Sequence, residues 1–429
     1  AAVGTMSDGG AKKARRSKKR KSRRRVTPEQ ALASKCVHDW VFSDCSSSGD
    51  ADDGDGFLAP LGAAATREQR VVFELHAHST RSDGYLSPAA VVQRAHRNGV
   101  KVLALTDHDT MDGVPEAVEM ARKLGIRIIP GVEISTIFSP RQGSGTEEPV
   151  HLLAYYGSCG PSRYEELESH LTSIRDGRYH RAKNMLLKLD KLKMPLKWEH
   201  VTKIAGNGVA PGRLHVARAL VEAGYVENLK QAFSRYLYDG GPAYATGSEP
   251  LAEEAVQLIC RTGGVVALAH PWSLKDPIPI IRALKAAGLH AIEVYRGDGK
   301  MSVFSDLADA YGLLKLGGSD YHGRRSQDES DLGAVNLPVT AVHDFLKLAR
   351  PIWLNAIRDV LTTFADEPSH TSLERLLRFG KIKNKAQAAV TSGRDIVDLS
   401  LASWLTKEER EGTELEGLRL RLSSVVINK

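Results

Sequence analysis

The chain has 429 residues and carries 59 Lys and Arg against 52 Asp and Glu, which gives a net charge of +7. With 42% hydrophobic and 26% charged residues, the composition is that of an ordinary globular protein, which excludes a fibrous or wholly disordered chain. No uncharged apolar run reaches about 18 residues, so we expect no transmembrane helix and no membrane partner.

The cysteines indicate the redox compartment. Cys36, Cys45, Cys159 and Cys260 are far apart in sequence and form no C-x-x-C pair. They support neither a disulfide framework nor a zinc knuckle, so a reducing, intracellular compartment is expected.

Residues 1–56 are predicted to form a disordered tail. The segment Lys12–Arg25 holds eleven Lys and Arg and no acid, and a Ser-, Gly- and Asp-rich stretch follows a short apolar patch at Val37–Phe42. Such segments bury too little apolar surface to offset chain entropy. The basic run is typical of a nuclear import signal or a contact with nucleic acid, while organellar targeting stays open. This tail contributes +4 and the remaining residues +3, so the rest of the chain is close to neutral.

From about residue 69, short runs rich in Val, Ile and Leu alternate with helical patterns. The first two helices are expected at Pro88–Asn98, which begins after Ser87, and at Val114–Leu124, which ends before Gly125. This alternation predicts an α/β fold built on a parallel sheet. The expected strands are Val71–Leu75, Val100–Leu105, Arg127–Ile129, Val150–Tyr155, Val265–Ala269, Ala291–Tyr295 and Leu313–Leu316.

Residues 160–247 interrupt this alternation. They show no clear strand, but helical patterns at Ser162–Leu192, Arg213–Ala223 and Leu229–Tyr236. We interpret them as a helical insertion between strands four and five of a domain that covers residues 69–338. Residues 339–429 are predicted to be a mostly helical extension without an assigned role.

Metal-ligand residue types lie at the ends of the predicted strands. An H-x-H at the end of a strand places both imidazoles on the same face, because side chains alternate along a strand. In parallel α/β barrels the carboxyl ends of the strands form one rim, where active sites are built. We therefore expect nine candidate ligands to converge there: His76, His78, Asp83, His108, Glu133, His151, His270, Asp320 and His322.

The donor types indicate the kind of ion. Imidazoles and carboxylates without thiolates suit Mn²⁺, Zn²⁺ or Fe²⁺. Nine ligands are too many for one ion, and with Glu133 as a bridge they fit two or three divalent ions. Asp107 and Asp109 flank His108, and we expect them to orient a coordinated imidazole by hydrogen bonds.

The order of these motifs supports a family resemblance. The series H-x-H, S-D-G, T-D-H-D, G-x-E, a His on the next strand, A-H-P and S-D-x-H, over residues 71–338, resembles the PHP (polymerase and histidinol phosphatase) superfamily. Within it the chain is similar to nucleotide 3′,5′-bisphosphate phosphatases and to RNase AM-type 5′→3′ exoribonucleases.

The resemblance implies a distorted seven-stranded (β/α)7 barrel with a helical insertion and a trinuclear site, most often loaded with Mn²⁺. It also implies how the ligands are shared among the ions. The first group is His76, His78, Glu133 and Asp320, the second is Glu133, His151 and His270, and the third is Asp83, His108 and His322.

The insertion supplies candidate substrate-binding residues. Arg213 and His215 lie near an expected helix start, and in the family the equivalent R-x-H segment faces the metal site and contacts substrate phosphate. A guanidinium suits bidentate phosphate recognition; the alternative is a salt bridge at the helix end. For Arg178 and Arg181, we expect a solvated helix surface, with a second phosphate or a nucleic-acid backbone as the alternative.

These features favour an enzyme that hydrolyses phosphoesters of nucleotides or short RNA, with a metal-held hydroxide as the nucleophile. A histidinol-phosphatase-like enzyme for small molecules is the nearer alternative. An amidohydrolase is a further alternative, which is disfavoured because that family has a Lys on strand four, where this chain has His151. A third alternative is a non-catalytic, metal-stabilised scaffold that binds RNA through the basic tail. The tail is also a candidate contact for import machinery, and the oligomeric state does not follow from the sequence.

Overall fold

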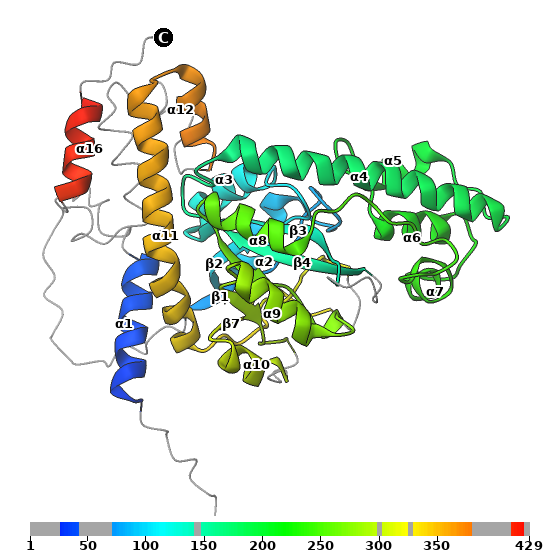
Figure 1. Ribbon diagram of the computed structural model, residues 1–429, viewed down its shortest axis with the longest axis horizontal. Helices are drawn as coiled ribbons and strands as arrows, with labels where there is room; N and C mark the ends of the chain where they lie inside the picture. Colours follow the sequence, from blue (N-terminus) through cyan, green and yellow to red (C-terminus); the bar gives the residue numbers. More distant parts are fainter. Residues whose placement is uncertain are drawn as a thin grey trace, which may run out of the picture.

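The computed structural model describes residues 26–42, 71–140, 147–297, 303–324, 329–379 and 413–423. At its centre lies one seven-stranded sheet, with the strands side by side in chain order (Figure 1). The strands are β1 (Val72–Glu74), β2 (Val100–Leu105), β3 (Arg127–Phe138), β4 (Glu148–Tyr155), β5 (Val265–Leu268), β6 (Ala291–Glu293) and β7 (Leu314–Leu316).

The sheet is mixed and curled. β1, β2 and β3 are parallel, as are β5, β6 and β7, but β4 is antiparallel to both of its neighbours. The expectation of a wholly parallel sheet is therefore wrong at β4. No helix separates β3 from β4 in the described residues, and strands joined without a crossover pair in the antiparallel direction.

The two ends of the sheet meet beyond their last strands. Ala77 and Tyr321 form a parallel bridge, and the amide of His78 donates to the carbonyl of Tyr321 at 2.8 Å. The result is a mixed α/β fold around a curled seven-stranded sheet.

Five helices cover the convex face of the sheet and share a core with it, in which Val92, Ala117 and Val256 lie against strand residues such as Leu105 and Leu152. The two helices predicted at residues 88–98 and 114–124 are confirmed. The Ser87 hydroxyl accepts from Ala90 N at 3.3 Å at the start of the first, and Gly125 is left-handed at the end of the second. The five are α2 (Pro88–Arg97), α3 (Val114–Leu124), α8 (Ala252–Arg261), α9 (Pro277–Ala287) and α10 (Phe304–Ala310).

The concave face is covered by α11 (Val339–Asp366), which belongs to the same core as the strands. Phe345 and Trp353 pack beside Tyr155, and the Trp353 indole donates to the Tyr155 carbonyl at 2.9 Å. The folded unit therefore continues past the predicted boundary at residue 338.

Helix α1 (Pro28–Phe42) lies along α11 (Figure 1). Ala33, Val37 and Trp40 recur on one face and are buried, and Thr27 and Gln30 exchange hydrogen bonds that cap the helix start. The expected disorder of residues 1–56 is wrong for this segment, because its apolar stripe is long enough to pack on a neighbouring helix. Segment 12–25 and the acidic stretch after α1 lie outside the described residues.

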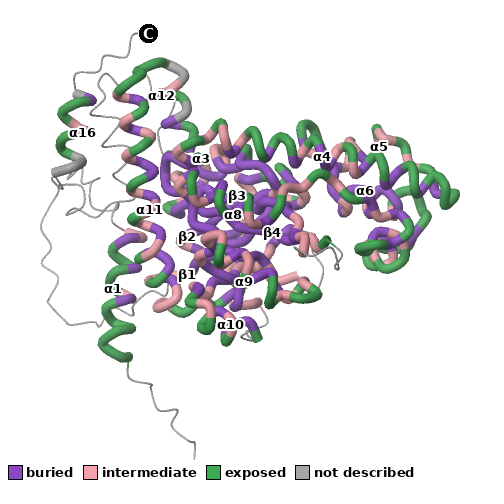
Figure 2. Tube along the Cα trace, in the orientation of Figure 1, coloured by how far each residue is buried: buried purple, intermediate pink, exposed green. Residues whose placement is uncertain are grey.

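A helical lobe stands apart from the sheet. Helix α4 (Tyr164–Lys191) runs outward, with α5 (Trp198–Ala205), α6 (Arg213–Glu222) and α7 (Leu229–Ala232) at its far end (Figure 1). A π-helical turn, Phe233–Leu237, follows α7. Residues 182–245, hereafter the lobe, share a small core of their own, and much of their outer surface is exposed (Figure 2).

Two further helices complete the described chain. Helices α12 (His370–Leu377) and α16 (Thr413–Ser423) pack against the last turns of α11 through Leu376, Leu422 and Phe364. Within the described residues, no helix combines the length and apolarity that crossing a membrane requires.

Candidate metal centre

All nine predicted ligand residues lie together at one end of the curled sheet. Seven of them line a cleft of about 640 Å³, whereas His76 and His78 lie beneath its floor and are fully buried. The reversal of β4 explains the place of His151: this residue is near the start of its strand, and only an antiparallel β4 brings that start to the same rim. The cleft is therefore lined by the ends of strands that are distant in sequence.

Glu133, from the middle of the long strand β3, lies at the centre of the cluster and is 1% exposed. Its Oε1 is 3.0 Å from both His151 Nδ1 and His270 Nε2. Its Oε2 is 3.1 Å from His78 Nε2, with ring nitrogens of His108 and His76 at 3.2 and 3.3 Å. One carboxylate thus faces five imidazoles, which is the arrangement that a ligand bridging two cations requires.

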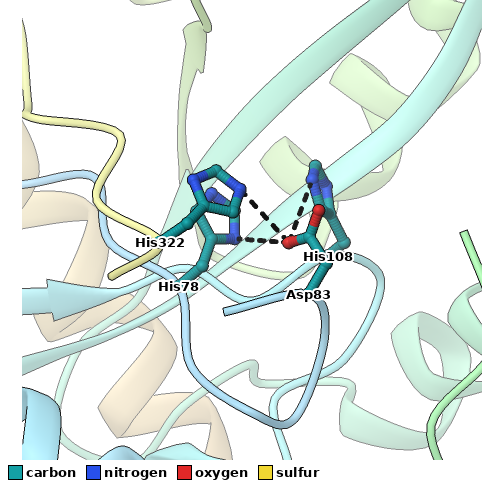
Figure 3. Close-up of side chains that lie close together, drawn as sticks. All are labelled: His78, Asp83, His108 and His322. Carbon is teal, nitrogen blue, oxygen red and sulfur yellow. Dashed lines mark ion pairs between the residues drawn. The ribbon is translucent and has the colours of Figure 1, made fainter. Parts of the chain in front are cut away.

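Two further carboxylates flank Glu133. Asp320 Oδ1 lies 3.2 Å from His78 Nε2 and 3.3 Å from His76 Nε2. On the other side, Asp83 Oδ1 lies 3.2 Å from His322 Nε2, with His108 Nε2 at 3.9 Å (Figure 3). His78 Nδ1 is 4.0 Å from the same oxygen of Asp83. The rings of His78 and His108 therefore both lie between Asp83 and Glu133.

Three groups of these residues have donor atoms within 4.8 Å of one another. One of them is the same as the first group that the resemblance implies, and another is the implied group of Asp83, His108 and His322 with His78 added. The remaining one contains His108 in place of His270 beside Glu133 and His151, although His270 also contacts Glu133. The groups are His76, His78, Glu133 and Asp320; His78, Asp83, His108 and His322; and His108, Glu133 and His151.

The donor atoms fit divalent cations. Both ring nitrogens of His78, Oδ1 of Asp83 and Nδ1 of His108 are buried without a hydrogen-bond partner of normal geometry among the described residues. Buried polar atoms are costly to leave unsatisfied. A cation would satisfy them, and nitrogen and carboxylate oxygen donors without sulfur suit Mn²⁺, Fe²⁺ or Zn²⁺.

The carboxylates also alter the protonation of the imidazoles. Burial disfavours a charge on His76, but Glu293, Asp320 and Glu133 outweigh it and raise its pKa well above the usual value. Against the same burial, Asp320 and Glu133 raise the pKa of His78 to about 10. A cation that binds here must displace these protons.

Two buried glutamates that the sequence did not single out hold the ligands in place. Glu293, at the end of β6, contacts His76 Nδ1 at 3.1 Å and accepts from the backbone N–H of His270 at 2.7 Å. Glu74, in β1, accepts from the amides of Ser319 and Gly333 at 2.9 and 2.8 Å. An acid inside an otherwise apolar strand run was the available signal for both.

The expectation that Asp107 and Asp109 orient an imidazole is not what the structure shows. Asp107 accepts from the amide and hydroxyl of Ser79 and from the hydroxyl of Ser82, each at 2.7 Å. It thereby shapes the loop that presents Asp83. Asp109 accepts from Arg178 Nε at 2.6 Å and from the amide of Ser135 at 2.7 Å, so it orients a guanidinium instead of a ring.

Arg178 and Arg181 are not on a solvated surface, which corrects the expectation for them. Both line the cleft; Arg178 is 8% exposed, and Arg181 is paired with Glu249. The helical pattern of α4 gave no sign of which face would meet the sheet, and these arginines lie on that face.

The two candidate substrate-binding residues lie in different surroundings. Arg213 lines the cleft and pairs with Asp239. His215 is 2% exposed and lines a small pocket that Asp83 and His108 share with the cleft. Its Nδ1 accepts from the amide of Gly212 at 2.9 Å, and it bonds the backbone of Ser82. Burial lowers the pKa of His215 to about 4, which keeps its ring neutral.

A family model and several known proteins resemble this chain. The PHP domain family model matches residues 74–266. A 3′,5′-nucleoside bisphosphate phosphatase of Chromobacterium violaceum is 33% identical over 287 residues, which are 65% of this chain and 94% of the relative. A 5′-3′ exoribonuclease of Haemophilus influenzae is 33% identical over 258 residues, 58% of this chain and 89% of the relative.

A solved structure gives the same result for the fold. A Bifidobacterium adolescentis protein, assigned as a metal-dependent phosphoesterase, superposes with a TM-score of 0.57 at 28% identity. The superposition covers 65% of this chain and 96% of that protein.

Proposed function

The chain belongs to the PHP domain family, and from this premise we propose that it is a metal-dependent phosphoesterase that hydrolyses nucleotide phosphates. The substrate is a 3′,5′-bisphosphonucleoside or a short RNA that is cleaved from its 5′ end. The two relatives described above are named for these two activities.

One observation carries the proposal. Glu133 faces five imidazoles at the floor of a cleft that is also lined by Arg178, Arg181 and Arg213. A bridging carboxylate among imidazoles suits neighbouring divalent ions, and guanidinium groups suit the phosphate oxygens that such ions attract. Hydrolysis of a phosphoester fits both features.

We assign the nine ligands to two or three ions in the groups that the resemblance implies, and we expect Mn²⁺ as the usual metal. When bound, such ions supply charge neutralisation and water of lowered pKa. We also infer that the curled sheet is a distorted seven-stranded barrel, and that the helices between β4 and β5 are an insertion into it.

The chain's own residues bind and position the substrate. Arg178 presents its guanidinium to the cleft, held by Asp109 and Ser135. Arg213 lies beside it at the start of α6 and supplies a second guanidinium for phosphate. His215 acts indirectly, because its neutral ring ties the start of α6 to the loop that carries Asp83.

The test is an assay of the purified full chain with Mn²⁺ on both substrates. We expect inorganic phosphate from a 3′,5′-bisphosphonucleoside, or mononucleotides from a 5′-phosphorylated oligoribonucleotide. Failure on both substrates by protein that elemental analysis shows to be fully metallated would overturn the proposal.

The substitution Glu133→Gln provides the matched inactive variant. Gln keeps the size of the side chain but has one neutral oxygen where Glu offers two charged ones. We expect turnover to be lost and the metal content to fall. Unchanged metal content would contradict the bridging role of Glu133.

A further inference from the structure

The near-neutral charge of the chain after residue 56 conceals an uneven distribution. That region carries +3 in total, yet the lobe alone holds ten Lys and Arg against five Asp and Glu, which gives +5. The remainder of the region is therefore slightly acidic, and its positive charge is concentrated in the lobe, which contributes Arg213 to the cleft.

Helix α4 adds a row of cations along one side, of which Arg178 and Arg181 precede the lobe and Lys188 belongs to it. Arg178, Arg181 and Lys188 recur at intervals of three and seven residues, so they lie near one face of the helix. Arg178 and Arg181 line the cleft, and Lys188 lies beyond it, with its ammonium bonded to the carbonyl of Tyr244. At 1.5 Å per residue the row extends about 15 Å from the first to the last cation.

The charges of the three cations are compensated differently. Arg178 and Arg181 pair with Asp109 and Glu249. Lys188 donates to a backbone carbonyl, which carries no net charge, so its charge stays available to a phosphate. Lys183, one turn earlier, lies over the ring of Trp198 at 5.2 Å and is on the other side of α4.

Aromatic rings border the same path. Phe233 and Tyr244 line the cleft, and the Tyr244 ring has the guanidinium of Arg213 5.6 Å from its centroid. Tyr238 lies nearby in sequence and is 49% exposed. Basic grooves with interspersed aromatic rings are how proteins bind single-stranded nucleic acid without reading its sequence.

We propose that the lobe is a docking surface for single-stranded RNA, with the 5′ end at the metal centre and the following phosphates along the Arg178–Lys188 row of α4. This inference rests on the proposed function and chooses between its two substrates. A mononucleotide fills the cleft alone and does not reach Lys188, whereas an oligonucleotide extends past Tyr244 to it. The natural substrate is therefore an RNA of several nucleotides.

The experiment compares Lys188→Gln with the matched control Lys183→Gln, an exposed lysine on the other side of the same helix. Two readouts are taken for each variant and for the unchanged chain. The first is KM for a 5′-phosphorylated RNA pentamer and for a 3′,5′-bisphosphonucleoside. The second is the Kd of a fluorescent phosphorothioate RNA pentamer by anisotropy, over a series of salt concentrations.

We expect Lys188→Gln to raise the pentamer KM and Kd at least about threefold and to lower the salt slope of binding by about 1. The KM for the mononucleotide should stay within about twofold, and Lys183→Gln should change neither substrate. A pentamer Kd and KM that are unaffected by Lys188→Gln would overturn the inference, and so would equal losses on both substrates.

These outcomes separate the inference from the function on which it rests. If the unchanged chain hydrolyses neither substrate, the proposed function fails, and the anisotropy measurement still decides whether the lobe binds RNA through Lys188. If it hydrolyses both and the two variants behave alike, the function stands and the docking surface falls.

Discussion

At the residue scale, the metal centre depends on side chains that never reach the cleft. Three of the four described non-glycine residues with a positive φ are Asp109, His270 and Asp320, all at the site. Such conformations persist only where the surroundings enforce them. At His270 the enforcing contact is the hydrogen bond from its amide to Glu293, which also holds the ring of His76.

Glu293→Gln tests this role. The amide can replace only one of the two carboxylate oxygens as an acceptor, so either His76 or the backbone of His270 loses its partner. Loss of such a supporting group commonly costs 10–100-fold in metal affinity, and we expect a loss of about that size for Mn²⁺, measured by calorimetric titration of the apoprotein.

The control for Glu293→Gln is Glu119→Gln, the same change at an exposed glutamate of α3 that pairs with Lys123 and lies outside the metal centre. It should leave Mn²⁺ affinity unchanged. If both variants bind Mn²⁺ like the unchanged chain, Glu293 does not position the ligands.

At the element scale, α1 is the segment that the sequence placed in a disordered tail. Trp40 is 2% exposed. The guanidinium of Arg127, a residue of β3, lies over its ring, 4.4 Å from the ring centroid. The helix therefore contacts both α11 and the sheet. We infer that α1, together with α11, covers the face of the sheet opposite α2, α3, α8, α9 and α10.

Trp40→Ala should consequently destabilise the whole domain. Removing a buried aromatic ring costs about 3–5 kcal/mol, which thermal and urea unfolding would register as a lower midpoint. Leu32→Ala, at a residue of the same helix that is 60% exposed, should change stability by less than about 0.5 kcal/mol. Equal midpoints for the two variants would show that α1 is not part of the cooperative unit.

At the scale of the whole molecule, the sequence predicted the candidate ligands but not the roles of the residues that support them. A spacing of two residues after a predicted strand identifies the pair His76 and His78, and likewise the pair Asp320 and His322. Glu293 and Glu74 act on backbone amides that are distant in the chain, and no local spacing reveals such partners. The direction of β4 and the inward face of α4 likewise depend on packing, which periodicity alone does not determine.

Metal removal should lower the stability of the entire fold, since the ligands come from strands across the sheet. Ions that bind only the native state stabilise it by mass action. We expect chelation by EDTA to lower the thermal midpoint of the full chain and added Mn²⁺ to restore it. In Glu133→Gln the difference between chelated and Mn²⁺-loaded protein should shrink; a midpoint that does not respond to either treatment would argue against ions at the site.

The bridge between Ala77 and Tyr321 has a consequence for synthesis. It joins the first pair of ligands, His76 and His78, to the last pair, Asp320 and His322, which leave the ribosome only after most of the domain. A nascent chain that is still growing therefore displays histidines without the partners that complete their coordination. Two of the three ligand groups, those that include Asp320 or His322, are therefore complete only when the end of the sheet has paired with its beginning.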